Sequence, residues 1–189
     1  MISSMVLALL ILACWLLLVL YWKISARTIK PAAELQSLAG KLARTPEYLG
    51  FILLAMAWVY PLGPVVSAHT AVLQWLGVAL CVLGLAVSIW SRKTLGDNWS
   101  QDVEFKQDHK LIEQGPYRYA RHPIYTGHLL MALGTAIASG RLIAYAGVLS
   151  LFLGFYIKLC QEETLLLRHF PEEYPGYKTR VKALIPFVL

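Results

Sequence analysis

The residues from Gly115 to Gly127 read GPYRYARHPIYTG and gather side chains that can bind a charged small molecule. Two arginines supply positive charge, one histidine supplies two ring nitrogens, and three tyrosines supply aromatic faces and hydroxyl groups. Pro123 suits the first turn of a helix, because its missing N–H is no loss there. The N-terminus of such a helix is partially positive, so together with Arg118 and Arg121 it predicts a corner that attracts anions.

Carboxylates follow in a second polar segment, where Glu162 and Glu163 lie one turn beyond Lys158. A pocket between the two segments would suit a ligand with both a carboxylate and a cationic group. The alternative is that the arginines only snorkel to a membrane interface and the tyrosines only form an aromatic belt. The packing of a histidine and two tyrosines into nine residues behind a Gly-Pro turn favours a binding site.

The composition indicates the kind of scaffold that positions these residues. The chain has 189 residues, of which 58% are hydrophobic and 15% charged, whereas soluble domains are about 45–50% apolar and about 25% charged. Five apolar stretches approach the roughly 20 residues that a spanning helix needs: about 2–22, 48–66, 70–90, 123–139 and 142–160. The sequence therefore predicts an all-α polytopic membrane protein, one domain over 1–189, with a tail from 161 to 189. The last two spans should form a tight antiparallel hairpin that carries the ligand pocket at its cytoplasmic end.

The basic residues are sorted by segment. Sixteen of the seventeen lie between spans one and two, between spans three and four, or from Lys158 on, and only Arg141 is left over. This positive-inside pattern predicts an outside N-terminus and a cytoplasmic C-terminus, and it explains the net charge of +6 without a nucleic-acid partner. The first span lacks a basic n-region and is expected to remain as an anchor. The three cysteines lie far apart in apolar runs, so no metal site is predicted.

The motif GPYRYARHPIYTG, followed by EETLLLRHFPEEYPGYKTRVKALIP, resembles the isoprenylcysteine carboxyl methyltransferase family. That family has a GxYxxxRHPxYxG motif, then EExxLxxxFxxEYxxYxxxV and a final IP, and the match covers roughly residues 109–186. The resemblance implies an integral membrane enzyme that transfers a methyl group from S-adenosylmethionine to the carboxylate of a prenylated cysteine, or of a similar lipophilic acceptor that enters from the membrane lipid. The short chain resembles prokaryotic members, which implies a location in the inner membrane.

The resemblance also implies which residues contact the cofactor: His109, Lys110, Leu111, Ile112, Tyr117, His122, Pro123, Ile124, Tyr125 and Glu162. A carboxylate is already ionised at neutral pH, so such an enzyme needs proximity, orientation and exclusion of water more than acid–base catalysis. His122 is accordingly expected to position the cofactor rather than to act as a general base.

The chain departs from the family pattern at one position. In the family an arginine usually lies four residues before the cofactor glutamate and holds the acceptor carboxylate, and here Lys158 takes that place. Lysine keeps the charge but loses the two-pronged geometry of a guanidinium. We expect Lys158 to hold the acceptor's carboxylate, and the alternative is a plain helix-surface pair with Glu162.

Three other functions remain open at this stage. A phospholipid N-methyltransferase would share a similar cofactor hairpin but would act on an amine. A membrane sterol-type reductase that uses NADPH shows a related GxWxxSRHPNYxGE pattern, from which this chain departs at Tyr117, Ala120, Ile124 and His128. A non-enzymatic membrane scaffold would leave the paired polar motifs unexplained.

Overall fold

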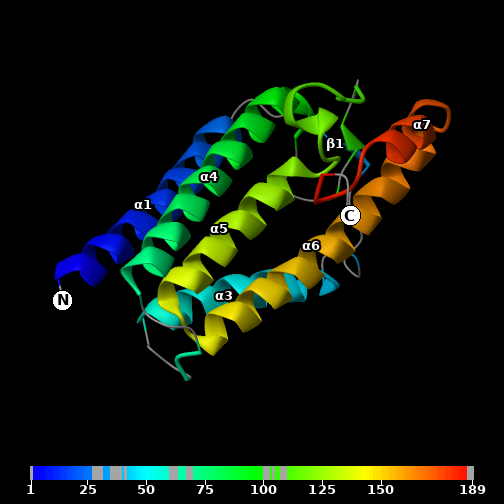
Figure 1. Ribbon diagram of the computed structural model, residues 1–189. Coiled ribbons are helices and arrows are strands. Elements are labelled where there is room, and N and C mark those ends of the chain that lie inside the picture. The colour runs from blue at the N-terminus through cyan, green and yellow to red at the C-terminus, as the bar shows by residue number, and fades with distance from the viewer. Residues whose placement is uncertain are drawn as a thin grey trace.

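The computed structural model describes residues 2–26, 32–34, 40, 42–59, 64–66, 70–99, 103, 105–106 and 110–186. Among these described residues, five long helices form a bundle, and a shorter helix of eight residues near the C-terminus lies at one end of it (Figure 1). The helices are α1 (Ile2–Ser25), α3 (Thr45–Val59), α4 (Ala71–Leu95), α5 (Pro123–Ser139), α6 (Leu142–His169) and α7 (Glu173–Arg180).

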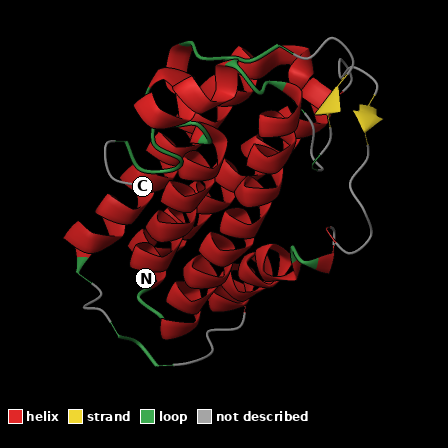
Figure 2. Cartoon of the chain, turned by 90° about the vertical axis from the view of Figure 1, so that its right-hand side faces the viewer, coloured by secondary structure: helices red, strands yellow, loops and turns green. Residues whose placement is uncertain are grey.

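Two short strands depart from the all-α expectation. Strand β1 (Ala32–Glu34) pairs antiparallel with β2 (Phe105–Lys106). Figure 2 shows this small ribbon at one corner of an otherwise helical molecule. Two short 3-10 turns, η2 (Gly96–Asn98) and η3 (Gly115–Arg118), also lie between α4 and α5 among the residues that the structure describes.

Three of the described helices, α1, α4 and α6, are long and apolar enough to cross a membrane. Helices α3 and α5 have 15 and 17 residues, which at 1.5 Å per residue correspond to about 22 and 25 Å. Helix α3 ends at Val59, before the expected limit at residue 66, and Val65 instead forms a bridge with Arg141.

The turn between α5 and α6 lies where the sequence predicts it. Helix α5 ends at Ser139, and Gly140 adopts a left-handed conformation with φ 64° and donates its N–H to the Ala136 carbonyl at 2.9 Å. Helix α6 then continues to His169, well past residue 160. Glutamate, glutamine and leucine are good helix formers, so the helix extends into the polar region after the apolar run has ended.

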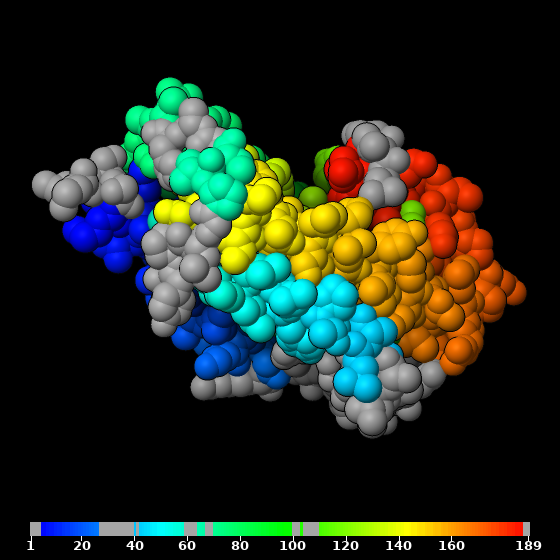
Figure 3. All heavy atoms as spheres, turned by 90° about the horizontal axis from the view of Figure 1, so that it is seen from below, coloured from blue at the N-terminus to red at the C-terminus, as the bar shows by residue number. Residues whose placement is uncertain are grey.

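The two arms of this hairpin pack mainly against other helices rather than against each other. Helix α5 packs along α4, and α6 packs along α3, as Figure 3 shows for the second pair. Glycines allow both approaches: a Cβ on Gly127 would lie 2.7 Å from the Gly84 carbonyl oxygen, and a Cβ on Gly154 would lie 2.6 Å from Glu47 Cα. Close backbone contact through small residues is typical of helices that associate within a membrane. The expected tight hairpin is therefore wrong, and α5 and α6 diverge from their turn.

Candidate active site

The C-terminal segment holds the RHP motif in place at the open end of the bundle. Ala120 pairs with Lys182 as in a parallel ladder, and the N–H groups of Arg121 and His122 donate to the Lys182 and Ala183 carbonyls at 2.8 and 2.9 Å. Leu184 is buried beneath this pairing. The backbone on both sides of His122 is thus fixed by residues about 60 positions later in the chain.

Helix α7 adds side-chain contacts to the same clamp. The Tyr177 hydroxyl donates to the Tyr117 carbonyl at 2.7 Å, and Arg180 pairs with Glu113 at 2.8 Å. Burial raises the pKa of the Tyr177 hydroxyl, so this group remains a donor at neutral pH. We refer to α7 and the segment Val181–Pro186 together as the C-terminal brace.

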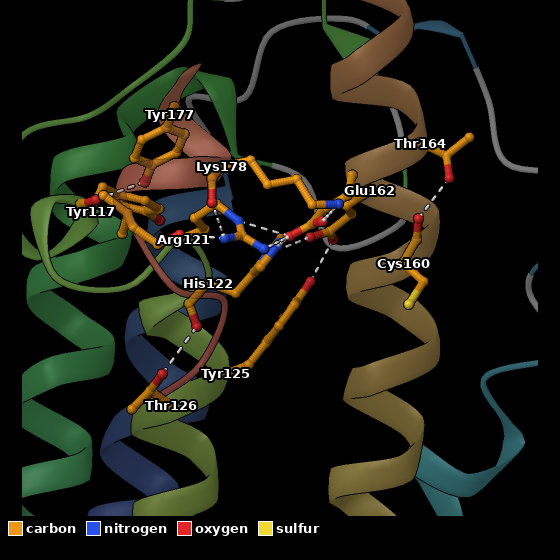
Figure 4. A network of polar contacts seen from close by, with 12 residues as sticks. Tyr117, Arg121, His122, Tyr125, Thr126, Cys160, Glu162, Thr164, Tyr177 and Lys178 are labelled. Carbon is orange, nitrogen blue, oxygen red and sulfur yellow. Dashed lines mark hydrogen bonds and ion pairs between the residues drawn. The ribbon is translucent and has the colours of Figure 1, made fainter. Parts of the chain in front are cut away.

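Glu163 is the ionic centre that joins the brace to the motif. Its carboxylate accepts from Arg121 Nη2 at 2.6 Å and lies 2.7 Å from Lys178 Nζ and 3.3 Å from His122 Nε2. Figure 4 shows the side chains of Arg121, His122 and Lys178 close together. Arg121 also donates to the carbonyls of Lys178 and Val181. The guanidinium of Arg121 is therefore committed to internal partners, and it does not supply the open anion-attracting corner that the sequence predicted. Arg118 is exposed to solvent.

Glu162 faces a different direction from its neighbour. Its carboxylate accepts a hydrogen bond from the Tyr125 hydroxyl and lies 3.3 Å from His122 Nδ1. The His122 ring stacks on the Tyr125 ring at a centroid distance of 5.5 Å, and Tyr125 stacks on Phe155 at 4.9 Å. Residues of α5 and α6 thus meet through a column of three parallel rings.

His122 is held between the two carboxylates. Burial by itself lowers the pKa of this imidazole, but the hydrogen bonds that it donates to the Glu162 and Glu163 carboxylates outweigh that effect and raise the pKa above its usual value. Burial also raises the pKa of the Tyr117 hydroxyl, which stays protonated. At neutral pH we therefore expect a cationic His122, which is a poor general base and a good positioning group.

A cavity of about 600 Å³ opens between α1, α3, α5 and α6. Its polar lining comes mainly from the motif, α5 and α6, and its apolar lining comes mainly from α1, α3 and α6. The polar lining includes Tyr117, Arg121, His122, Tyr125, His128, Lys158 and Glu162, and the apolar lining includes Trp15, Leu18, Val19, Trp22, Phe51 and Phe155.

Lys158 lies on this cavity from α6. Its residue is 5% exposed, and its Nζ lies 5.3 Å from the centre of the Tyr125 ring, a distance typical of a cation–π contact. The ammonium thus lies inside the protein beside the aromatic column, on the same cavity as Glu162 one turn further along the helix. This position is more enclosed than the helix-surface pair that the sequence left open.

The remaining sequence-predicted residues divide into two groups. Tyr117 and Ile124 line the cavity, whereas Pro123 is buried in the first turn of α5 away from it. Lys110, Leu111 and Ile112 precede η3, and Lys110 is exposed; none of the three lines the cavity. His109 lies outside the described residues. Within the described ranges, no three histidine, cysteine, aspartate or glutamate side chains gather as metal ligands would.

Two cavity residues were missed by sequence reasoning. Glu47, at the start of α3, pairs with the buried Arg44 at 2.9 Å and faces the cavity. His128 lies one turn after Tyr125 and also lines the cavity. The spacing of His128 from the motif could have identified it, because residues three apart share a helix face. No local signal brings Glu47 here, since its position depends on how α3 packs against α6.

Comparison with known proteins defines the class. The sequence model of the phospholipid methyltransferase family matches residues 72–173, which include α4, α5, α6 and the motif between them. The chain belongs to this family. It is an integral membrane protein, and its main architecture is helical.

The resemblance to isoprenylcysteine methyltransferases is confirmed by individual relatives. The chain is 31% identical over 122 residues to the protein-S-isoprenylcysteine O-methyltransferase of Tribolium castaneum, over 61% of this chain and 43% of the relative. It is 33% identical over 127 residues to the Saccharomyces cerevisiae protein of that name, over 65% of this chain and 52% of the relative. The chain thus spans about half the length of these curated relatives.

A solved structure shows the same similarity. The eukaryotic intramembrane Ras methyltransferase, an isoprenylcysteine carboxyl methyltransferase, matches with a TM-score of 0.59 and 28% identity. The match covers 76% of this chain and 51% of that protein.

Proposed function

We propose that the protein transfers a methyl group from S-adenosylmethionine to the carboxylate of a lipophilic acceptor such as an isoprenylated cysteine. The observation that carries this proposal is the cavity, in which Glu162, His122 and Lys158 share one space with an apolar wall of tryptophan, leucine and phenylalanine side chains. A polar end and an apolar end in one cavity match an acceptor that has a charged head and a hydrocarbon tail.

The cofactor fits the residues at the polar end. A volume of about 600 Å³ lies within the range of roughly 300–1,000 Å³ for small-molecule sites. Glu162 already accepts from Tyr125 and contacts His122, but an ionised carboxylate has about four acceptor positions, so it can still bind an amine or a ribose hydroxyl. Tyr117, His122, Ile124 and Tyr125 complete this wall; the roles of His109, Lys110, Leu111, Ile112 and Pro123 rest on the family resemblance alone.

The proposed methyl transfer requires little acid–base catalysis from the protein. When bound, S-adenosylmethionine supplies a methyl group on a positively charged sulfur. Transfer of this methyl group to a carboxylate oxygen forms an ester, leaves a neutral thioether and releases no proton. Lys158 orients the acceptor carboxylate, and the aromatic column keeps water away from it. Exclusion of water matters because hydration weakens an anionic nucleophile.

The membrane arrangement follows from the same reasoning. We propose that all five apolar segments cross a membrane as parts of one domain, with the N-terminus outside and the C-terminus in the cytoplasm of a prokaryotic cell. The sorting of basic residues supports this orientation, and the cavity then opens at the cytoplasmic end. The cofactor enters from the cytoplasm, and the acceptor enters sideways from the lipid.

A methyl-transfer assay with purified protein tests the proposal. The protein in detergent or lipid nanodiscs is given labelled S-adenosylmethionine and N-acetyl-S-farnesylcysteine, and base-labile ester label is counted. Calorimetric titrations with S-adenosylmethionine and, separately, with NADPH run alongside. Binding of NADPH alone would overturn the methyltransferase proposal in favour of a reductase, and binding of neither would favour a scaffold.

Phospholipid N-methylation is the second candidate, because Glu47 adds a further carboxylate to the cavity lining and could attract an amine head group. The family match is also to phospholipid methyltransferases. The same assay with phosphatidylethanolamine vesicles separates the two, since methylated amines resist base and methyl esters do not.

A further inference from the structure

His128 lines the cavity, but the proposed reaction assigns it no role. It lies one turn after Tyr125 on α5, and its ring is edge-on to Trp22 at 5.3 Å and to Phe155 at 5.9 Å. The imidazole therefore lies between the aromatic column and the end of α1, where the polar and apolar parts of the cavity meet.

The contacts of the ring determine which nitrogen carries the proton. Nδ1 lies 2.7 Å from the Ile124 carbonyl oxygen and 3.3 Å from the Ser88 hydroxyl. A carbonyl oxygen can only accept, so Nδ1 must donate to it. Burial among aromatic rings, on a cavity that already holds the Lys158 ammonium, favours the neutral imidazole. Nε2 is then a bare acceptor, and among the residues that the structure describes it has no hydrogen-bond partner.

The position of His128 Nε2 relative to Lys158 follows from one helical turn on α5 and one on α6. Tyr125 and His128 are one turn apart on α5, and Phe155 and Lys158 are one turn apart on α6. The stacked rings of Tyr125 and Phe155 join these turns at 4.9 Å. Lys158 and His128 consequently flank the same ring pair, with the cation on the side of Glu162 and the histidine on the side of the apolar wall.

We propose that His128 is a specificity-determining residue that accepts a hydrogen bond, through Nε2, from an N–H group next to the acceptor's carboxylate. This inference rests on the proposed methylation of a carboxylate held by Lys158. An acylated form of the isoprenylated cysteine proposed above carries such an amide N–H on the same carbon atom as its carboxylate. A simple fatty acid has the carboxylate and the chain but gives His128 nothing to bind.

A pair of acceptors that differ in one atom tests the proposal. The first is N-acetyl-S-farnesylcysteine, and the second is its ester analogue, in which an oxygen replaces the amide N–H. Both are assayed with the wild-type protein, with His128→Phe, which removes the acceptor nitrogen, and with His128→Gln, which keeps an acceptor oxygen. His169→Phe, at an exposed histidine at the end of α6, is the matched control.

We expect the wild-type protein and the control to show a KM roughly fivefold to tenfold lower for the amide than for the ester, as one neutral hydrogen bond provides. In His128→Phe this preference disappears while kcat changes little, and His128→Gln restores part of it. A purely structural role of His128 would raise both KM values equally and leave the amide preference intact, because the difference between acceptors isolates the one interaction.

The outcomes separate the two proposals. If the wild-type protein methylates both acceptors and His128→Phe retains the amide preference, the role of His128 is wrong and the proposed function stands. If the wild-type protein binds S-adenosylmethionine but methylates neither acceptor, the proposed acceptor is wrong, and the inference about His128 falls with it.

Discussion

Replacing Glu162 and Glu163 one at a time should separate cofactor binding from stability. Successive residues on a helix point about 100° apart, so these neighbours face different surroundings. Glu162 lines the cavity, and Glu163 pairs with Lys178 of the C-terminal brace. We expect Glu162→Ala to weaken binding of S-adenosylmethionine and Glu163→Ala mainly to destabilise the fold.

The contacts give the size of each effect. The side chains of Glu163 and Arg121 are only 7% and 8% exposed, and removal of one partner from a buried ion pair costs about 3–5 kcal/mol. For a chain of this size that corresponds to a fall in melting temperature of roughly 6–20 °C. Loss of the Glu162 carboxylate removes a charged hydrogen bond to the cofactor, which costs roughly 1.5–3 kcal/mol, or about tenfold to a hundredfold in affinity.

The assay combines two measurements on detergent-purified protein. Thermal unfolding without ligand is followed by circular dichroism, and S-adenosylmethionine affinity is measured by isothermal titration calorimetry. Glu172→Ala, at an exposed glutamate before α7, serves as the control and should change neither quantity. The reasoning is refuted if both glutamate variants lose affinity equally while their melting temperatures stay at the wild-type value.

Four further outcomes are expected. Lys158→Met should abolish methyl transfer and leave cofactor affinity nearly intact. Lys158→Arg should retain turnover, because a guanidinium also binds carboxylates. Full turnover by Lys158→Met would show that this lysine is only an interfacial anchor. Gly154→Ala should lower the melting temperature and disturb the cavity, since its new Cβ would lie 2.6 Å from Glu47 Cα. Gly176→Ala should be tolerated, because its Cβ meets only the end of a flexible arginine at 3.4 Å. Equal changes in melting temperature for the two variants would contradict the close packing of α3 on α6. The pKa of His122 is raised in the folded protein, so protonation of this imidazole stabilises the fold fully below its ordinary pKa near 6.5 and less as the pH rises through its pKa in the folded protein. The melting temperature should therefore fall above about pH 6.5, and it should fall less steeply in His122→Gln. Parallel curves of melting temperature against pH for the two proteins would argue against a cationic His122. Cysteine labelling at the two termini in intact cells should find them on opposite sides of the membrane, and labelling from the same side would exclude the five-span arrangement.

The sequence predicted the local parts of the site well. Pro123 and the Ser139-Gly140 turn defined α5 and the start of α6, because proline and glycine act through their own backbone preferences. The motif residues Tyr117, His122 and Tyr125 line the same cavity as Glu162 and Lys158. Local chemistry and spacing were sufficient for these residues.

The contacts that depend on distant segments could not be predicted. Arg121 was expected to face an anion, but it pairs with Glu163 and with carbonyls of the brace. Nothing within the motif itself indicates that partner, because it is supplied by a helix about 40 residues later. The same applies to Glu47, which reaches the cavity only through the packing of α3 on α6.

The glycines of α5 and α6 lie in close contact with other helices rather than with each other. Lipid chains are as apolar as the helix surfaces, so close packing rather than burial from water decides which helices associate in a membrane. Gly127 on α5 is in close contact with α4, and Gly154 on α6 is in close contact with α3. The faces that α5 and α6 turn toward each other carry large rings instead, including Tyr125 and Phe155. These stacked rings line the cavity together with Lys158, His128 and Glu162, so the contact between α5 and α6 at this level is made by aromatic side chains and not by backbone.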